Sequence, residues 1–304
     1  MNNIEHKFES IGERREDYTL TSNSRGKYVF TSERDGEAAV VSVVKEEGKN
    51  WFSEEFIEPH VMKRIPKEVN SPKLHDYDVS ERIMKMSYLG GTELDFSNGN
   101  KTMFYSLGRQ LGELHSLSLS LSLSNKYGGL YPTDSGALEA RETFHDFVEK
   151  YFSKLGSELD SGSSPRLRVK EELKTVEPPE PCLSHGDPHP SNVINSSGGV
   201  YLIDWENAFQ SDGLSEFLAF RERQAAKTDN KKKKTTIRKE MSNGYFSTVN
   251  YDLSDRTVAL LYSFGLATWC LRYNMTVPPY NKRVSEVVSE ILETPPEKEK
   301  IIFT

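Results

Sequence analysis

Residues 182–206 read CLSHGDPHPSNVINSSGGVYLIDWE, and this segment concentrates the polar residues that decide how the chain is interpreted. A polar loop leads into a short apolar stretch, a turn of small residues and a second apolar stretch that ends at Asp204. Asp187 and Asn192 lie five positions apart on the loop, and we expect Asp204 to reach them from the facing strand. Placing such groups at strand ends is costly unless a cation or a reacting proton needs them. Because oxygen donors beside phosphates suit Mg²⁺, the segment predicts a magnesium site.

The composition is that of a soluble, folded chain of 304 residues, with 36% apolar residues, 28% charged residues and a formal net charge of −7. This length suits one large domain or two packed lobes. The net negative charge disfavours a nucleic acid or a membrane as the main partner. Cys182 and Cys270 are too few for a disulfide framework or a four-ligand zinc site. We expect a cytoplasmic protein, because no signal peptide is visible and the uncharged run 257–271 is shorter than the ~20 residues of a membrane span.

The first 90 residues have the patterns of a small antiparallel sheet with one helix. Asp35-Gly36 is a hairpin signal, since these residue types suit a positive φ, and an apolar, β-branched run follows it. Apolar residues at helical spacing surround Pro59, which should kink or restart the helix. The expected elements are strands at 18–21, 27–31, 38–44, 73–78 and 81–89 and a helix at 53–65.

The remainder of the chain is mostly helical by its apolar spacing. The alternation of Leu and Ser at 116–124 is interpreted as a low-complexity connector. The run Lys231–Lys234 is interpreted as a solvated, mobile loop, because the net charge is negative and no aromatic side chains for stacking on RNA lie nearby. The expected helices cover 103–117, 144–155, 214–225, 235–249 and 254–273.

The pattern His185-Gly186-Asp187, four further residues and Asn192, followed by Ile203-Asp204-Trp205-Glu206, resembles the aminoglycoside phosphotransferase and choline kinase family. That family shares its architecture with protein kinases. The resemblance implies an α+β, bilobal, protein-kinase-like fold. A small antiparallel lobe with one helix would bind nucleotide at 1–89, and a larger, mainly helical lobe would bind the acceptor at 90–304.

The family also implies nucleotide-binding positions in the first lobe. Lys45 ends the third expected strand, where the family's nucleotide lysine sits. Glu58 has the better spacing to hold this lysine, and Glu55, on the same helical face, stays open as an alternative. Further cofactor-binding positions are the phosphate-covering turn with Ser22, Ser24 and Gly26, and the interlobe segment with Ser87 and Leu89, whose backbone usually meets adenine.

The implied reaction transfers the γ-phosphoryl group of ATP to a hydroxyl of a small molecule, with ATP and Mg²⁺ as cofactors. Asp187 would accept or orient the acceptor's proton. Asn192 and Asp204 would hold Mg²⁺, and Lys45 would neutralise the α- and β-phosphates. We expect His185 to brace the loop by packing and hydrogen bonding instead of acting as a base.

Three alternatives accompany this interpretation. A protein kinase needs a long activation segment, but only about ten residues separate Asp204 from the helix expected near Leu214, which favours a small acceptor. A pseudokinase would bind nucleotide without transfer, and a nucleic-acid-binding protein would use the basic region around Lys231. The acceptor (aminoglycoside-, choline- or sugar-like), the choice of ATP or GTP and the oligomeric state stay open. Acidic residues favour a cationic or neutral acceptor: Glu206, Asp212, Glu216, Glu142, Asp146 and Glu149.

Overall fold

The computed structural model describes residues 2–23, 26–34, 37–45, 56–96, 99–116, 126–132, 138–155, 165–177 and 180–272, with 293, 297 and 301. The chain divides into two compact units. Unit 1 comprises Met1–Leu94, Gly129–Glu139 and His185–Ala208, and unit 2 comprises Asp95–Gly128, Ala140–Ser184 and Phe209–Thr304. The motif segment that follows Ser184 therefore belongs to the same unit as the N-terminal strands.

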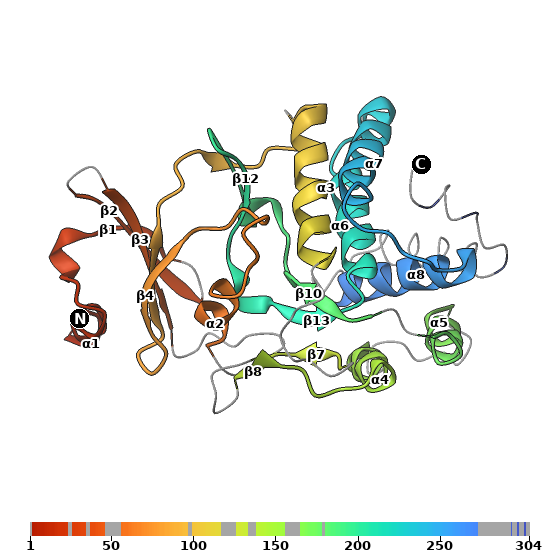
Figure 1. Ribbon diagram of the computed structural model, residues 1–304, viewed down its shortest axis with the longest axis horizontal. Helices are drawn as coiled ribbons and strands as arrows, with labels where there is room; N and C mark the ends of the chain where they lie inside the picture. Colours follow the sequence, from red (N-terminus) through yellow and green to blue (C-terminus); the bar gives the residue numbers. More distant parts are fainter. Residues whose placement is uncertain are drawn as a thin grey trace. The chain divides into compact units, whose positions relative to one another are not determined.

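Unit 1 is built on a five-stranded antiparallel sheet of order β1-β2-β3-β5-β4 (Figure 1). The strands are β1 (Thr19–Asn23), β2 (Lys27–Arg34), β3 (Glu37–Val44), β4 (Leu74–Asp78) and β5 (Ile83–Ser87). The β2–β3 register runs from Lys27↔Val44 to Arg34↔Glu37. This pairing confirms the predicted hairpin, although its turn residues, Asp35 and Gly36, lie outside the described residues.

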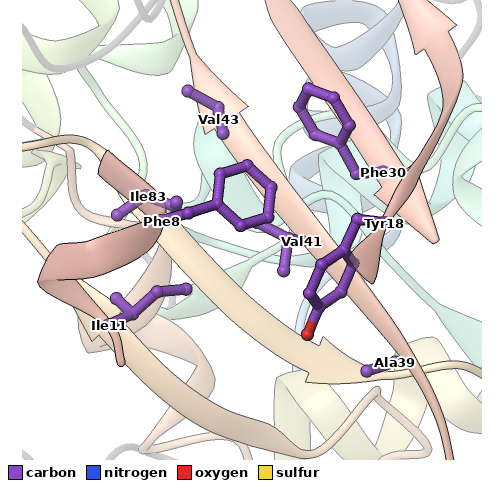
Figure 2. Close-up of a cluster of buried hydrophobic side chains, with 8 residues drawn as sticks. All are labelled: Phe8, Ile11, Tyr18, Phe30, Ala39, Val41, Val43 and Ile83. Atoms are coloured by element: carbon purple, nitrogen blue, oxygen red, sulfur yellow. The ribbon is translucent and has the colours of Figure 1, made fainter. Parts of the chain in front are cut away.

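The two faces of this sheet have different neighbours, because successive side chains of a strand alternate between faces. Helix α1 (Asn2–Ser10) and the short helix η1 (Arg15–Asp17) supply the cover of one face. There Phe8 meets Phe30 edge to face, with ring centres 5.2 Å apart. Lys27 and Val44 have the opposite parity and point to the other face. The buried cluster on the α1 face comprises Phe8, Ile11, Tyr18, Phe30, Ala39, Val41, Val43 and Ile83 (Figure 2).

The rest of unit 1 contains short elements. Helix α2 (Glu58–Met62) has Pro59 in its first turn, where the missing N–H of proline is harmless. Residues 53–55 of the expected helix lie outside the described residues. Strands β11 (Val193–Ser196) and β12 (Gly199–Leu202) form the hairpin expected from the sequence. The remaining elements are β6 (Thr92–Glu93), which pairs with β11, η2 (Pro190–Asn192), η3 (Trp205–Asn207), and the pair β8 (Tyr131–Pro132) and β9 (Leu138–Glu139).

Unit 2 is mainly helical, and glycines allow two of its helices to approach closely. A Cβ on Gly108 of α3 would lie 2.0 Å from the carbonyl oxygen of Met241 in α7, and one on Gly244 would lie 2.0 Å from that of Tyr105. Figure 1 shows α3 and α7 side by side. The helices are α3 (Lys101–Ser116), α4 (Phe144–Leu155), α5 (Pro165–Leu173), α6 (Leu214–Ala226), α7 (Lys231–Tyr245) and α8 (Asp255–Arg272). A sheet of order β10-β13-β7 joins β10 (Cys182–Ser184), β13 (Phe209–Ser211) and β7 (Gly128–Gly129).

Two expectations for unit 2 change. The loop expected at Lys231–Lys234 is wrong, because these lysines form the first turn of α7. Asn230 caps that turn by accepting from the backbone N–H of Lys233, and lysine has a good helix propensity. Helix α5 is additional to the predicted helices and begins at Pro165, while the Leu/Ser alternation at 117–124 lies outside the described residues. Within the described part of the chain, no helix has the length and apolar content needed to cross a membrane.

Candidate functional site

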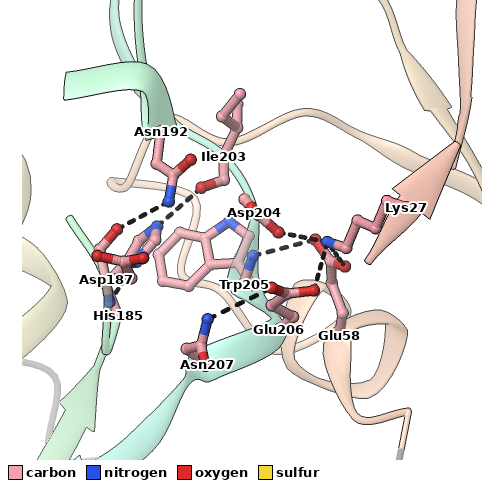
Figure 3. A network of polar contacts seen from close by, with 10 residues as sticks. All are labelled: Lys27, Glu58, His185, Asp187, Asn192, Ile203, Asp204, Trp205, Glu206 and Asn207. Carbon is pink, nitrogen blue, oxygen red and sulfur yellow. Dashed lines mark hydrogen bonds and ion pairs between the residues drawn. The ribbon is translucent and has the colours of Figure 1, made fainter. Parts of the chain in front are cut away.

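Lys27 lies among three carboxylates of unit 1, one from helix α2 and two from the segment around η3 (Figure 3). Its Nζ is 3.0 Å from Oε2 of Glu58 and 2.9 Å from Oε2 of Glu206, and it donates to Oδ1 of Asp204. The side chains of Lys27 and Glu58 are only 11% and 2% exposed. We call these four residues the Lys27 cluster. One ammonium facing three carboxyl groups leaves an excess of negative charge around Lys27.

The electrostatics of the Lys27 cluster follow from this charge excess. Burial alone would lower the pKa of Lys27, but the carboxylates of Asp204, Glu58 and Glu206 raise it well above its usual value. The pKa of Glu58 is raised to about 7, mainly by burial and also by the charges of Asp204 and Glu206, while Lys27 opposes this rise. Lys27 therefore stays a cation, and the cluster favours additional positive charge.

The donor set fits a divalent cation. Glu58, Asp204 and Glu206 each offer a carboxylate oxygen, and the three oxygens lie within 4.8 Å of one another. Hard oxygen donors with excess negative charge are what Mg²⁺ requires. Glu206 was not among the residues predicted to bind metal.

The structure corrects the ion pair expected between Lys45 and Glu58, because Lys27 forms it instead. Lys45 directly follows Val44, which shares a face of the sheet with Lys27. A shift of one residue moves a side chain to the opposite face, so Lys45 points toward the α1 face. There its Nζ lies 4.3 Å from the ring centre of Tyr28 and 2.8 Å from Oδ1 of Asn23. Glu55, the alternative partner, lies outside the described residues.

Glu58 also ties helix α2 to the segment after Asp204. Its Oε1 accepts a hydrogen bond from the backbone N–H of Trp205 at 3.0 Å. The Trp205 indole is fully buried and donates from Nε1 to Oγ of Ser71 at 3.0 Å. Glu58 is thereby fixed at both carboxylate oxygens, since Oε2 is held by Lys27.

Asp204 has an uncommon backbone conformation. Its φ of 66° and ψ of 67° are left-handed, and among the described residues only one other non-glycine residue, Arg82, has a positive φ. Such conformations cost about 1–3 kcal/mol and persist only where the surroundings impose them. The hydrogen bond between Glu58 and the N–H of Trp205 is one such constraint on the backbone immediately after Asp204.

His185 braces the motif loop, as expected. Its side chain is buried and its ring centre lies 4.5 Å from that of Trp205. Nδ1 accepts from the backbone N–H of Asp187 at 3.3 Å, so Nε2 carries the proton and donates to the carbonyl of Ile203 at 2.9 Å. The imidazole therefore connects the loop that carries Asp187 to the strand end that carries Asp204.

Position 186 accommodates only glycine. Its φ is +81°, and a Cβ at this position would lie 1.8 Å from the carbonyl oxygen of Asn207. The backbone beside Asp187 is therefore packed directly against the segment after Glu206.

Asn192 is oriented by the loop itself. Its Nδ2 donates to the carbonyl of Asp187 at 2.9 Å, and its own carbonyl accepts from the N–H of Ile203 at 3.0 Å. Within the described part of the chain Oδ1 has no hydrogen-bond donor, so this oxygen is available to a cation. These bonds hold the backbone at Asp187 and Asn192 to Ile203, the residue directly before Asp204.

The other expected nucleotide-binding residues that the structure describes lie in or beside the strands of unit 1. Ser22 lies exposed in β1, and the carbonyl of Gly26 accepts from the N–H of Lys45 at 2.9 Å. Ser87 ends β5, and the carbonyl of Leu89 accepts from Oγ of Ser196 at 2.8 Å. Ser24 lies outside the described residues. Their nucleotide contacts stay predictions.

The acids of unit 2 that were considered for acceptor binding have structural partners. Buried Asp212 accepts from the N–H and the hydroxyl of Ser215, each at 2.7 Å. Glu216 lies 3.0 Å from Nε2 of His115, and Glu149 pairs with Lys170 and Lys174. Further pairs join Glu142 to Lys150 and Asp146 to Thr143. The charge argument for a cationic acceptor therefore rests mainly on Glu206.

Comparison with solved structures defines the class of fold. Choline kinase LicA from Streptococcus pneumoniae is 16% identical, with 96% of this chain and 98% of that chain covered and a TM-score of 0.61. A choline/ethanolamine kinase family protein from Mesorhizobium loti is 14% identical, with coverages of 97% and 95% and a TM-score of 0.61. A thermostable mutant of aminoglycoside phosphotransferase APH(4)-Ia is 16% identical, with coverages of 96% and 98% and a TM-score of 0.57. At these identities the likeness concerns the fold, and it confirms the predicted protein-kinase-like class.

The sequence places the chain within that class. The model of the phosphotransferase enzyme family matches residues 9–219, so the chain belongs to this family. No curated protein sequence compared with the chain matches it significantly.

Proposed function

We propose that this protein transfers the γ-phosphoryl group of Mg·ATP to a hydroxyl of a small molecule. Family membership supports phosphoryl transfer as the class of reaction. The observation that carries the proposal is the hydrogen-bonded connection of the loop: Asn192 holds the carbonyl of Asp187 and accepts from Ile203, directly before Asp204. These bonds support the proposal because they hold the backbone of the Asp187 loop beside the residue that precedes Asp204.

In this proposal Asp187 orients the acceptor hydroxyl and takes its proton as the hydroxyl oxygen bonds to the γ-phosphorus, while the bond from that phosphorus to the oxygen of the leaving ADP breaks. Asp204 and the free Oδ1 of Asn192 hold Mg²⁺, and Glu206 adds negative charge beside it. The metal, when held by these residues, would supply positive charge beside the phosphates of ATP. Glu58 fixes the lysine of the cluster and the backbone after Asp204, so it is a positioning residue.

A small acceptor suits the short connection after the metal-binding segment. Only β13 lies between η3 and helix α6, so the chain has no room there for the activation segment of a protein kinase. APH(4)-Ia has been solved with ADP and hygromycin B, and LicA, a choline kinase, has been solved with AMP. We propose a hydroxylated acceptor that is aminoglycoside-, choline- or sugar-like.

The test has two stages. Calorimetric titration first measures Mg·ATP affinity, and binding that requires Mg²⁺ is expected. ADP release is then followed with panels of aminoglycosides, amino alcohols and sugars, and the phosphoester product is identified by mass spectrometry. The Asp187→Asn variant is the matched control, and its acceptor-dependent ADP release should be slower by roughly 10²–10⁴. A wild-type chain that does not bind Mg·ATP would contradict the proposal.

A further inference from the structure

We propose that Lys27, at the start of strand β2, is the lysine that contacts the α- and β-phosphates of ATP. Protein kinases carry this lysine on their third strand. The inference deepens the proposed function and rests on it. It assigns the phosphate contact to Lys27 on β2 in place of Lys45, which follows β3.

The side chains of β3 alternate between the two faces of the sheet, and this alternation shows which of them face the Lys27 cluster. Lys27 stands opposite Val44, and Val29 stands opposite Ser42 on the same face. The site-facing positions along this part of β3 are therefore Val40, Ser42 and Val44, and none of them is a lysine. Lys27 instead comes from the neighbouring strand and reaches the acidic cluster from there.

Ser42 marks a β3 position from which a lysine could serve the same cluster. It is 3% exposed, and its hydroxyl has no hydrogen-bond partner in the described part of the chain. Its cross-strand neighbours, Val29 and Met84, are apolar, so their side chains offer the hydroxyl no hydrogen bond. Ser42 and Lys27 are diagonal neighbours, which lie about 7–8 Å apart and within reach of long side chains.

The partners of Lys27 are those a phosphate-binding lysine needs. Glu58 holds the ammonium from helix α2 and is itself fixed by the N–H of Trp205. Asp204, proposed to bind Mg²⁺, contacts the same Nζ. Lys27 also directly follows Gly26, the last residue of the turn expected to cover the phosphates. One segment would therefore supply both backbone amides and an ammonium to the nucleotide.

A purely structural role makes a different prediction. If Lys27 only neutralised the three carboxylates, its removal would reduce the stability of unit 1, but it would not discriminate between ligands with and without phosphates. The ratio of Mg·ATP affinity to adenosine affinity therefore separates the two roles, because adenosine has no phosphate for a lysine to contact.

The experiment compares Lys27→Met with Lys85→Met by calorimetric titration of Mg·ATP and of adenosine. Lys85 is a matched control, since it lies on the same sheet, pairs with Glu13 at 2.5 Å and points to the α1 face. Lys27→Met should weaken Mg·ATP binding about 10- to 100-fold and change adenosine binding less than about twofold. Lys85→Met should leave both affinities within about twofold of wild type.

A transplanted lysine provides the second readout. The double variant Lys27→Ala/Ser42→Lys should bind Mg·ATP at least about fivefold more tightly than Lys27→Ala, because diagonal neighbours share this face. If Lys27→Met does not fold, the charge-matched variant Lys27→Met/Glu206→Gln is compared with Glu206→Gln. It should show the same selective loss of Mg·ATP affinity.

The contradicting outcomes are distinct. Lys27→Met that binds Mg·ATP as tightly as wild type overturns the inference alone, as does Lys45→Met with the larger selective loss. Equal losses for Mg·ATP and adenosine, with reduced stability, assign Lys27 a structural role and also overturn the inference. A wild-type chain that binds no Mg·ATP overturns the proposed function and the inference with it.

Discussion

Glu58 accepts the backbone N–H of Trp205 at 3.0 Å, and this bond joins helix α2 to the segment that follows Asp204. The other oxygen of the same carboxylate accepts from Lys27 at 3.0 Å. A single buried side chain therefore controls the position of a cationic group and the backbone conformation beside a proposed metal ligand. These two tasks can be separated by substitution.

Replacing Glu58 by Gln retains an oxygen that can accept from Trp205, whereas Ala removes it. A buried N–H left without an acceptor costs about 1–3 kcal/mol, so Glu58→Ala should be less stable than Glu58→Gln by about that amount. Urea unfolding of both variants measures the difference. Equal stabilities would show that the bond to Trp205 contributes nothing.

Gly186→Ala should lower the stability of the fold more than the same substitution at Gly12, another glycine with a positive φ. Both Gly186 and Gly12 have a positive φ, at 81° and 71°, but a Cβ on Gly12 has no atom within 4 Å. Gly12→Ala therefore adds only the backbone strain of about 1–2 kcal/mol. Gly186→Ala also displaces the carbonyl of Asn207 and should cost a further ~1–3 kcal/mol. Thermal unfolding of the two variants measures this, and equal losses would contradict the close approach at Gly186.

In unit 2, Glu222 should contribute stability that depends on pH. Burial would raise the pKa of Glu222, but Arg221 and Arg238 lower it below its ordinary value of 4.5. The Nη2 atoms of both arginines lie 2.8 Å from its carboxylate oxygens. A carboxylate whose folded-state pKa is lowered stabilises the fold above the unfolded pKa and loses this contribution as the pH falls through the folded pKa.

Glu222→Gln should therefore cost about 2 kcal/mol at pH 7, and the difference from wild type should shrink as the pH falls below about 4.5. Urea unfolding at a series of pH values measures it. The exposed Glu177 provides the control, since Glu177→Gln should change stability by less than about 0.5 kcal/mol. A stability difference for Glu222→Gln that grows with acidity would contradict a lowered pKa of Glu222 in the folded state.

The sequence predicts the strands and the motif loop because their signals are local. Asp35-Gly36 indicates the β2–β3 hairpin, and His185 to Asn192 carries the spacing of a known loop. Which lysine pairs with Glu58 cannot be predicted from the local sequence. The residues from Ala38 to Val44 are apolar on both faces except Ser42, so no alternation reveals which side chains face Glu58. Only the register Lys27↔Val44 decides between Lys27 and Lys45.

Helix α1 is a second feature that depends on contacts between distant parts of the sequence. Its nine residues are too few for a helix that is stable on its own in water. Phe8 is buried against Tyr18 and Phe30, residues that the chain brings to it only when the sheet forms. Tertiary packing therefore supplies the stability that the local sequence lacks.

The central claim is that Asp187 serves the acceptor and Asp204 serves Mg·ATP, and paired substitutions test it most directly. Asp187→Asn and Asp204→Asn are compared by calorimetric titration of Mg·ATP and by the rate of phosphoryl transfer to an active acceptor. We expect Asp187→Asn to retain Mg·ATP affinity within about threefold while its turnover falls by roughly 10²–10⁴. Asp204→Asn should lose both affinity and turnover. Near-normal turnover of Asp187→Asn would contradict the claim.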